Sequence, residues 1–110
     1  MTQLGPETSV LLLIDLQQRL MPAIHDGMSV LANAQRLARA ARLLQVPVQA
    51  TEQNPDGLGP TVAEIRPLAD AVLVKRFFDA TREPAWPAFL PTGRADVVVT
   101  GCEAHVCVVQ

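Results

Sequence analysis

The sequence has few cysteines, no long apolar run and no excess of positive charge. Its two cysteines, five residues apart, are too few for a disulfide framework and indicate a reducing compartment. The longest uninterrupted apolar run, Val10–Ile14, falls far short of the roughly 20 residues that span a bilayer. Nine basic residues against eleven acidic ones leave a net charge of −2, and the basic residues are scattered. This charge pattern excludes nucleic acid as an expected partner.

The N-terminus also lacks the features of a secretory signal. No basic segment precedes an apolar stretch with a small-residue cleavage site. With the low cysteine content, this predicts a cytoplasmic protein without a membrane partner. Apolar residues nevertheless make up 49% of the chain and charged residues 18%, which is typical of a folded protein. At 110 residues and 11.9 kDa, we expect one domain over residues 1–110.

Four short apolar runs predict strands, and the segment between the first two predicts a helix. The run at residues 10–14 does not alternate with polar residues, which favours a strand covered on both faces, as in a parallel sheet. Further strands are expected over residues 46–51, 71–74 and 97–100. Residues 28–45 have apolar side chains at helical spacing, with arginines on the other side. The apolar positions of this helix are Leu31, Leu37, Ala38, Ala41 and Leu44.

The later connections are shorter and less regular. Residues 54–57 have a turn signature, and a short helical stretch is expected after Gly59 and Pro60, through about Leu68. Three prolines between residues 79 and 92 predict an irregular loop with one short helix near Trp86. This alternation of strands and helices is typical of a doubly wound α/β sheet. Residues 104–110 resemble the first turns of a covering helix, so we expect a domain that continues further.

Three chemically capable residues follow the predicted strands. Asp15 and Lys75 come directly after their strands, and Cys107 lies seven residues beyond Thr100. Ligands of parallel sheets bind at this edge, because loops and helix N-termini gather there. Each residue also has an ordinary structural explanation: a cap or turn for Asp15, a solvated strand end for Lys75 and a small buried hydrophobe for Cys107. Together, a base, a cation and a thiol favour nucleophilic catalysis.

Four sequence blocks resemble the isochorismatase-like cysteine hydrolases. The blocks, in chain order, are LIDLQ (13–17), TEQNPDGLG (51–59), VLVKRF (72–77) and VTGCEAHVC (99–107). The last block is the most specific, and the resemblance covers essentially the whole chain. It implies a three-layer α/β/α sandwich around a Rossmann-like parallel sheet, with strand order 3-2-1-4 in the part present. It also implies that further strands and helices follow the nucleophile.

The resemblance assigns a role to each of the three residues. It implies Asp15 as general base and acid, Lys75 as the charge that supports the thiolate, and Cys107 as the nucleophile. The family also has a cis peptide bond that maps here between Cys102 and Glu103. The backbone N–H groups of Glu103 and Cys107 would then form the oxyanion hole.

The expected substrate is a small amide or carbamoyl compound. Isochorismate-cleaving members lack the nucleophilic thiol, so Cys107 favours hydrolysis of a C–N bond through a thioester. The histidines that bind a metal in nicotinamidases have no match at residues 51–55, so no metal and no cofactor are expected. Gln17, Gln53, Phe77 and Trp86 are candidate substrate contacts. For Phe77 and Trp86, a place in the core fits at least as well.

Other interpretations remain open from the sequence. An aspartyl-phosphate phosphatase would need an acid where Gln17 stands. Cys102, His105 and Cys107 are zinc-ligand types but lack a paired partner cluster. A non-catalytic interaction module would suit the short chain. In either case an uncovered apolar edge of the sheet favours a homo-oligomer.

Overall fold

The computed structural model describes residues 5–102, which form a four-stranded sheet with one long helix and several single turns. The strands are β1 (Ser9–Ile14), β2 (Val48–Gln53), β3 (Ala71–Lys75) and β4 (Asp96–Gly101). The α-helices are α1 (Gly27–Leu43), α2 (Pro55–Leu58) and α3 (Trp86–Phe89). Three 3₁₀ turns are η1 (Met21–Ala23), η2 (Arg66–Leu68) and η3 (Ala80–Arg82). No helix in this described part is both long and apolar enough to cross a bilayer.

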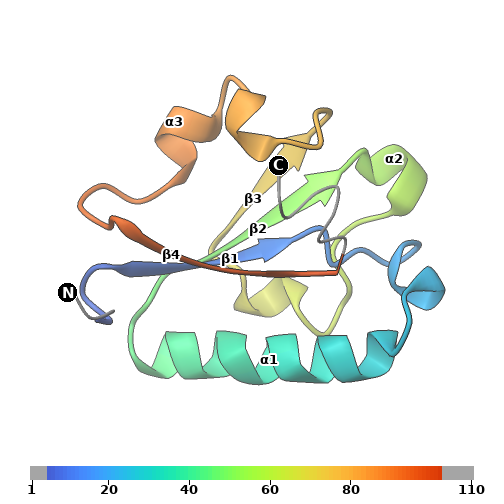
Figure 1. The fold of residues 1–110 in the computed structure, drawn as a ribbon, viewed down its shortest axis with the longest axis horizontal. Coiled ribbons are helices and arrows are strands. Elements are labelled where there is room, and N and C mark those ends of the chain that lie inside the picture. The colour runs from blue at the N-terminus through green and yellow to red at the C-terminus, as the bar shows by residue number, and fades with distance from the viewer. Residues whose placement is uncertain (1–4, 103–110) are drawn as a thin grey trace.

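The sheet is parallel throughout and has the order β3-β2-β1-β4, which confirms the predicted order (Figure 1). At the carboxyl end of the ladder, Ile14 of β1 pairs with Thr51 of β2 and with Gly101 of β4. On the far side of β2, Gln53 pairs with Lys75. The register therefore brings the ends of β1, β2 and β3 to one edge of the sheet, as the α/β prediction requires.

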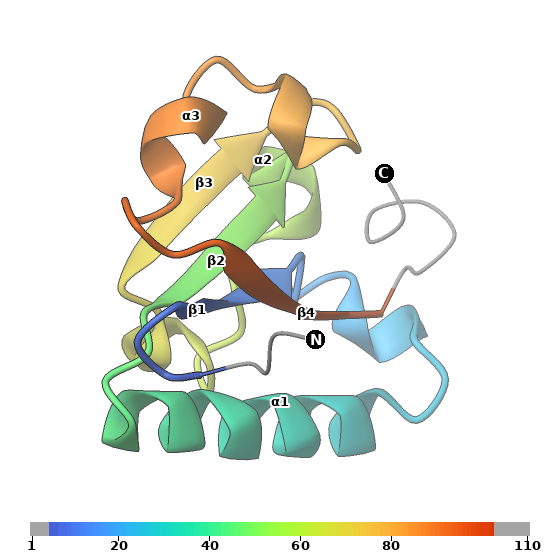
Figure 2. The same cartoon turned by 60° about the vertical axis from the view of Figure 1, so that its left-hand side comes forward.

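Helices cover the two faces of the sheet, and Figure 2 shows α1 beneath it and α3 above it. The face toward α1 holds the larger core, in which Leu11 and Leu13 of β1 pack with residues of α1 and β2. The opposite face holds a smaller core, where Leu12 and Ile14 contact Trp86 and Phe89. Side chains of a strand alternate between its faces, so β1 contributes to both cores and is buried along its whole length.

The helix predicted over residues 28–45 is α1, but its buried stripe differs from the prediction. The buried side chains are Ala34, Ala38 and Ala41, whereas Leu37 and Leu44 are 41% and 61% exposed. Small alanine side chains let the helix backbone approach the sheet closely. The prediction that Leu37 and Leu44 belong to the core-facing stripe is therefore wrong.

Two connections also differ from the sequence prediction. The second strand begins at Val48 rather than Val46, where the Asp70 carboxylate accepts the Val48 N–H at 2.8 Å. The helix expected after Pro60 and through Leu68 is wrong except for the last turn, η2. The beginning of that stretch is extended instead, because Thr61 forms an antiparallel bridge with Gln17.

The strand β4 lies at one edge of the described sheet and pairs with β1 there. Its Val97 and Val99 side chains are 38% and 43% exposed. The predicted loop over residues 79–92 contains η3 and α3, in agreement with the short helix expected near Trp86. The helix predicted over residues 104–110 lies outside the described residues.

Candidate active site

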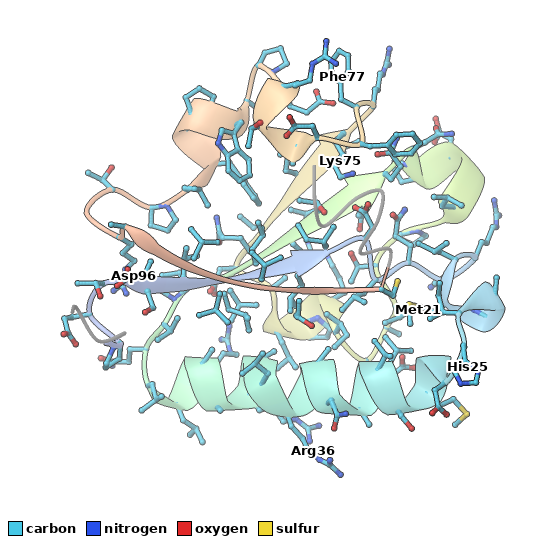
Figure 3. The ribbon with its side chains drawn as sticks, in the orientation of Figure 1. Met21, His25, Arg36, Lys75, Phe77 and Asp96 are labelled. Atoms are coloured by element: carbon cyan, nitrogen blue, oxygen red, sulfur yellow. The ribbon has the colours of Figure 1, made fainter. Side chains whose placement is uncertain are left out.

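Two of the predicted catalytic residues, Asp15 and Lys75, meet across the strand that separates them. Asp15 follows β1 directly and Lys75 ends β3, with β2 in between. The Lys75 Nζ lies 3.0 Å from Asp15 Oδ2, and the two side chains are 0% and 1% exposed. Figure 3 labels Lys75 on the side of the sheet opposite to α1. The two side chains therefore bridge the roughly 10 Å between alternate strands, as predicted.

The backbone of Asp15 leaves the strand in a left-handed conformation, with φ of 57°. This conformation is uncommon for residues other than glycine, and aspartate is one of the side chains that tolerate it. The Asp15 N–H is shared between the carbonyl and the hydroxyl oxygen of Thr51, both at 3.2 Å. Thr51 of β2 therefore fixes the position at which the chain turns away from β1.

The carboxylate of Asp15 has two oxygens in different surroundings. Oδ1 accepts a hydrogen bond of 2.7 Å from the Thr51 hydroxyl. Oδ2 lies beside the Lys75 ammonium but receives no directed hydrogen bond, and it is the one buried side-chain oxygen or nitrogen of residues 5–102 without such a partner. Oδ2 is therefore balanced by charge alone and keeps its lone pairs available.

The Lys75 ammonium explains this asymmetry. Its Nζ donates to Gln53 Oε1 at 2.8 Å, to the Phe78 carbonyl at 3.1 Å and to the Phe77 carbonyl at 3.4 Å. These three acceptors hold the ammonium in one place. Its charge is thereby fixed 3.0 Å from Asp15 Oδ2.

The loop after β3 supplies the two carbonyls that hold Lys75. Its shape depends on Glu83, whose Oε1 accepts the backbone N–H groups of Arg76 and Phe77. These two hydrogen bonds, the Arg76 bond first, hold the pKa of Glu83 below its ordinary value of 4.5. In the same loop the Thr81 hydroxyl and N–H bind the Asp79 carboxylate and lower its pKa.

Comparison with known proteins places this geometry in a family. The model of the isochorismatase domain matches residues 9–110, which is nearly the whole chain. The chain belongs to the isochorismatase family. A zebrafish isochorismatase domain-containing protein 2 is 36% identical over 107 residues, which cover 96% of this chain and 54% of the relative.

Solved structures with the isochorismatase-family fold match the sheet and its helices. A structure described as MAR1 ribonuclease from Caenorhabditis elegans has a TM-score of 0.88 and 31% identity, and the match covers 99% of this chain and 57% of that one. The YcaC protein of Escherichia coli, described as an octameric hydrolase of unknown specificity, has a TM-score of 0.82 and 22% identity; the match covers 97% and 56%. The chain thus spans about half the length of the zebrafish relative and of these two structures.

The predicted substrate contacts of this isochorismatase-family chain have different surroundings. Gln17 is 0% exposed. Its amide donates to the Gln53 and Gly59 carbonyls and accepts the Gln53 N–H, at 3.0, 2.7 and 2.8 Å. In the described residues, the Gln17 side chain ties the end of β2 to the following loop. Gln53 binds Lys75, and Phe77 is 42% exposed beneath the Arg82 guanidinium.

The remaining predicted site residues lie near or beyond the end of the described part. Cys107, Glu103 and His105, with the cis bond expected before Glu103, fall outside it. Cys102 is half-buried, with its Sγ 3.8 Å from the Met21 sulfur. Residues 5–102 contain no cluster of three or more metal-ligating His, Cys, Asp or Glu side chains.

One residue that holds the site was not predicted. Thr51 was part of the block at residues 51–59, but a threonine in a strand is ordinarily explained by β-propensity. The signal was its position at the last β2 residue that pairs with β1, opposite Ile14.

Trp86, the aromatic residue that fitted either a pocket or the core, packs against Phe89 and against Leu12 and Ile14 of β1.

Proposed function

We propose that this isochorismatase-family chain carries the catalytic machinery of a cysteine hydrolase that cleaves a C–N bond of a small amide or carbamoyl substrate. The observation that supports this most is the buried Asp15–Lys75 pair, in which Oδ2 of Asp15 has no hydrogen-bond donor. This oxygen is the candidate proton acceptor of the site, and the fixed cation beside it favours a neighbouring anion. A thiol that loses its proton there becomes an effective nucleophile.

The proposed reaction has two halves. In the first, the Cys107 S–H proton moves to Asp15 Oδ2 while sulfur attacks the carbonyl carbon. The C–N bond then breaks, and Asp15 returns the proton to the departing ammonia or amine. In the second half, water attacks the resulting thioester, gives one proton to Asp15, and the C–S bond breaks. Asp15 then returns its proton to the sulfur, so that the enzyme is regenerated.

Lys75 would act by its charge, because Gln53, Phe77 and Phe78 hold its ammonium in a fixed place beside Asp15. A fixed ammonium stabilises both the thiolate and the carboxylate without giving up a proton. The backbone N–H groups of Glu103 and Cys107 are proposed to bind the developing oxyanion, a contribution of about 3 kcal/mol per donor. No metal is included in this proposal.

Two broader proposals follow from the same family membership. We place the protein in the cytoplasm, because its two cysteines suit a reducing compartment. We also propose a homo-oligomer. The exposed valines of β4 support association, as does the octameric description of the E. coli neighbour.

Two alternatives make different predictions. A non-catalytic interaction module would keep the fold but would not need a reactive thiol. The nematode neighbour is described as a ribonuclease, but the net charge of −2 here does not favour a polyanionic substrate. RNA therefore belongs in the same assay as the amides.

Incubation of the full-length protein with a panel of small amides, ureas and RNA tests these possibilities. We expect amide turnover and a thioester adduct on Cys107, detected by mass spectrometry of the quenched protein. The Cys107→Ala variant should lose turnover, Asp15→Asn should lose about 10²–10⁴-fold, and Cys102→Ala should retain it. Undiminished amide hydrolysis by Cys107→Ala would exclude the covalent mechanism. RNA cleavage without amide turnover would favour the ribonuclease alternative.

A further inference from the structure

The hydroxyl of Thr51 makes two contacts with one residue, Asp15. It donates its single hydrogen to Oδ1 at 2.7 Å, and its oxygen accepts the Asp15 N–H at 3.2 Å. We infer that Thr51 is a positioning residue that makes Oδ2, and not Oδ1, the oxygen of Asp15 that exchanges the proton. This inference rests on the proposed function, because it assigns a task to a neighbour of the proposed base.

The geometry leaves the Asp15 carboxylate little freedom to rotate. Thr51 is 0% exposed and lies at the carboxyl end of the β1–β2 ladder, paired with Ile14 and Leu73. A β-branched side chain has few χ1 rotamers, so its hydroxyl stays in one place. With Oδ1 bound to this hydroxyl and the Asp15 N–H bound to the same oxygen, the direction of Oδ2 follows.

Removal of the Thr51 hydroxyl would change the hydrogen bonding between Lys75 and Asp15. Oδ1 would lose its donor while remaining buried, which is costly for a charged group. The nearest replacement donor is the Lys75 ammonium, which would turn from Gln53 or the Phe78 carbonyl toward the carboxylate. The direction of Oδ2 would then no longer be fixed by Thr51, and the ammonium would compete with the thiol proton for this oxygen.

The chain contains a matched comparison on the opposite face of the same strand. The next residue, Glu52, is 7% exposed, and its Oε2 accepts the Thr61 hydroxyl at 2.8 Å and the Thr61 N–H at 2.7 Å. This is again a buried threonine bound to a buried carboxylate. Successive strand residues face opposite sides, so Glu52 points away from Asp15. Lys75 is the charged side chain within residues 5–102 that pairs with Asp15.

The test measures the alkylation of Cys107 by iodoacetamide as a function of pH, in the full-length protein. Peptide mass spectrometry follows Cys107, with Cys102 as an internal reference. The variants are Thr51→Val, which removes the hydroxyl at nearly constant volume, Thr51→Ser, which restores it, and Thr61→Val as the matched control. We expect Thr51→Val to slow Cys107 labelling near neutral pH by about tenfold and to move its pH midpoint upward. Thr51→Ser should recover most of the rate, and Thr61→Val should label as the wild type does.

Several outcomes would overturn the inference. The inference fails if Cys107 in Thr51→Val is alkylated at the wild-type rate, or if Thr51→Val and Thr61→Val slow its alkylation equally. Thr51 would then be an ordinary structural residue. If Thr51→Val does not fold, Thr51→Ala against Thr51→Ser makes the same comparison. A further effect of Thr51→Val in an Asp15→Asn background would show that the hydroxyl acts elsewhere. If wild-type Cys107 is no more reactive than Cys102, the proposed function itself fails, and the inference fails with it.

Discussion

At the scale of single residues, the buried Asp15–Lys75 pair is the most demanding feature of the chain. Both charges have left water almost completely, and each carries a large desolvation cost. That cost is offset by their attraction and by the hydrogen bonds from Thr51 and to Gln53. Either charge alone, buried without its counter-ion, would therefore destabilise the folded protein.

We predict that Lys75→Met destabilises the protein by about 3–5 kcal/mol, because the Asp15 carboxylate is left buried without its cation. The double variant Asp15→Asn/Lys75→Met should recover more than half of that loss, since no charge remains buried. Urea denaturation followed by circular dichroism measures both values. Additive losses in the double variant would show that the two side chains do not depend on each other.

The sequence predicts this pair but not what holds it. Asp15 and Lys75 could be found because each follows an apolar run, and the ends of parallel strands share an edge. Thr51 could not be found, because its hydroxyl acts only once β1 lies beside β2. Gln17 could be found from its position after β1, but its surroundings could not. A backbone bridge to Thr61 and the contact of its amide with Gly59 depend on the loop after β2.

At the scale of elements, the loop after β3 matters as much as the strand. The carbonyls of Phe77 and Phe78 face the Lys75 ammonium because Glu83 holds the start of the loop from the other side. A partly exposed carboxylate thus shapes a fully buried ion site. The loop therefore belongs to the site although it contributes no proposed catalytic group.

We predict that Glu83→Gln lowers stability at neutral pH, because the carboxylate accepts its two N–H groups more strongly than an amide does. The pKa of Glu83 is lowered in the folded protein. Its contribution is therefore complete above its ordinary pKa of 4.5 and is lost as the pH falls through the lower folded value. The difference in unfolding free energy between wild type and variant should narrow below about pH 4.5.

Urea titrations at several pH values measure this difference. Glu64→Gln removes an exposed carboxylate on another loop and serves as the control. A gap between wild type and Glu83→Gln that stays constant from neutral to acidic pH would contradict the assigned hydrogen bonds.

The apolar pattern of the sequence predicts the elements better than it predicts their packing. The strands and α1 follow from short apolar runs and helical spacing, and their order matches the prediction. The inner face of α1 was mistaken, because leucine ranks above alanine in hydrophobicity while close packing selects the smaller residue. The stretch after Pro60 was mistaken because Thr61 binds Glu52, a partner on β2 that no local pattern shows.

At the scale of the whole molecule, the sheet is unevenly covered. Every residue of the central strand β1 is buried, whereas Val97 and Val99 of the edge strand β4 remain partly exposed. An apolar edge strand is a template for association. The described part of the chain is therefore well packed at its centre and open on one side.

We predict that the 110-residue chain self-associates through this edge, and that Val99→Lys lowers the associated fraction. A lysine at an edge strand disfavours strand addition and adds charge repulsion. Met28→Lys places the same charge on the exposed start of α1, at a side chain 88% exposed, and should change association little. Sedimentation velocity at several protein concentrations measures both. An unchanged distribution for Val99→Lys would exclude this edge as the contact.

The origin of the site's three groups on three different strands also links its chemistry to the order of folding. Base and cation belong to β1 and β3, and the hydroxyl between them belongs to β2. No hairpin or other local unit of the chain contains all three groups. During synthesis, a nascent chain that has not yet added its third strand therefore carries Asp15 without its cation. Under the proposed function, the reactivity of the Cys107 thiol and the native strand order should emerge together.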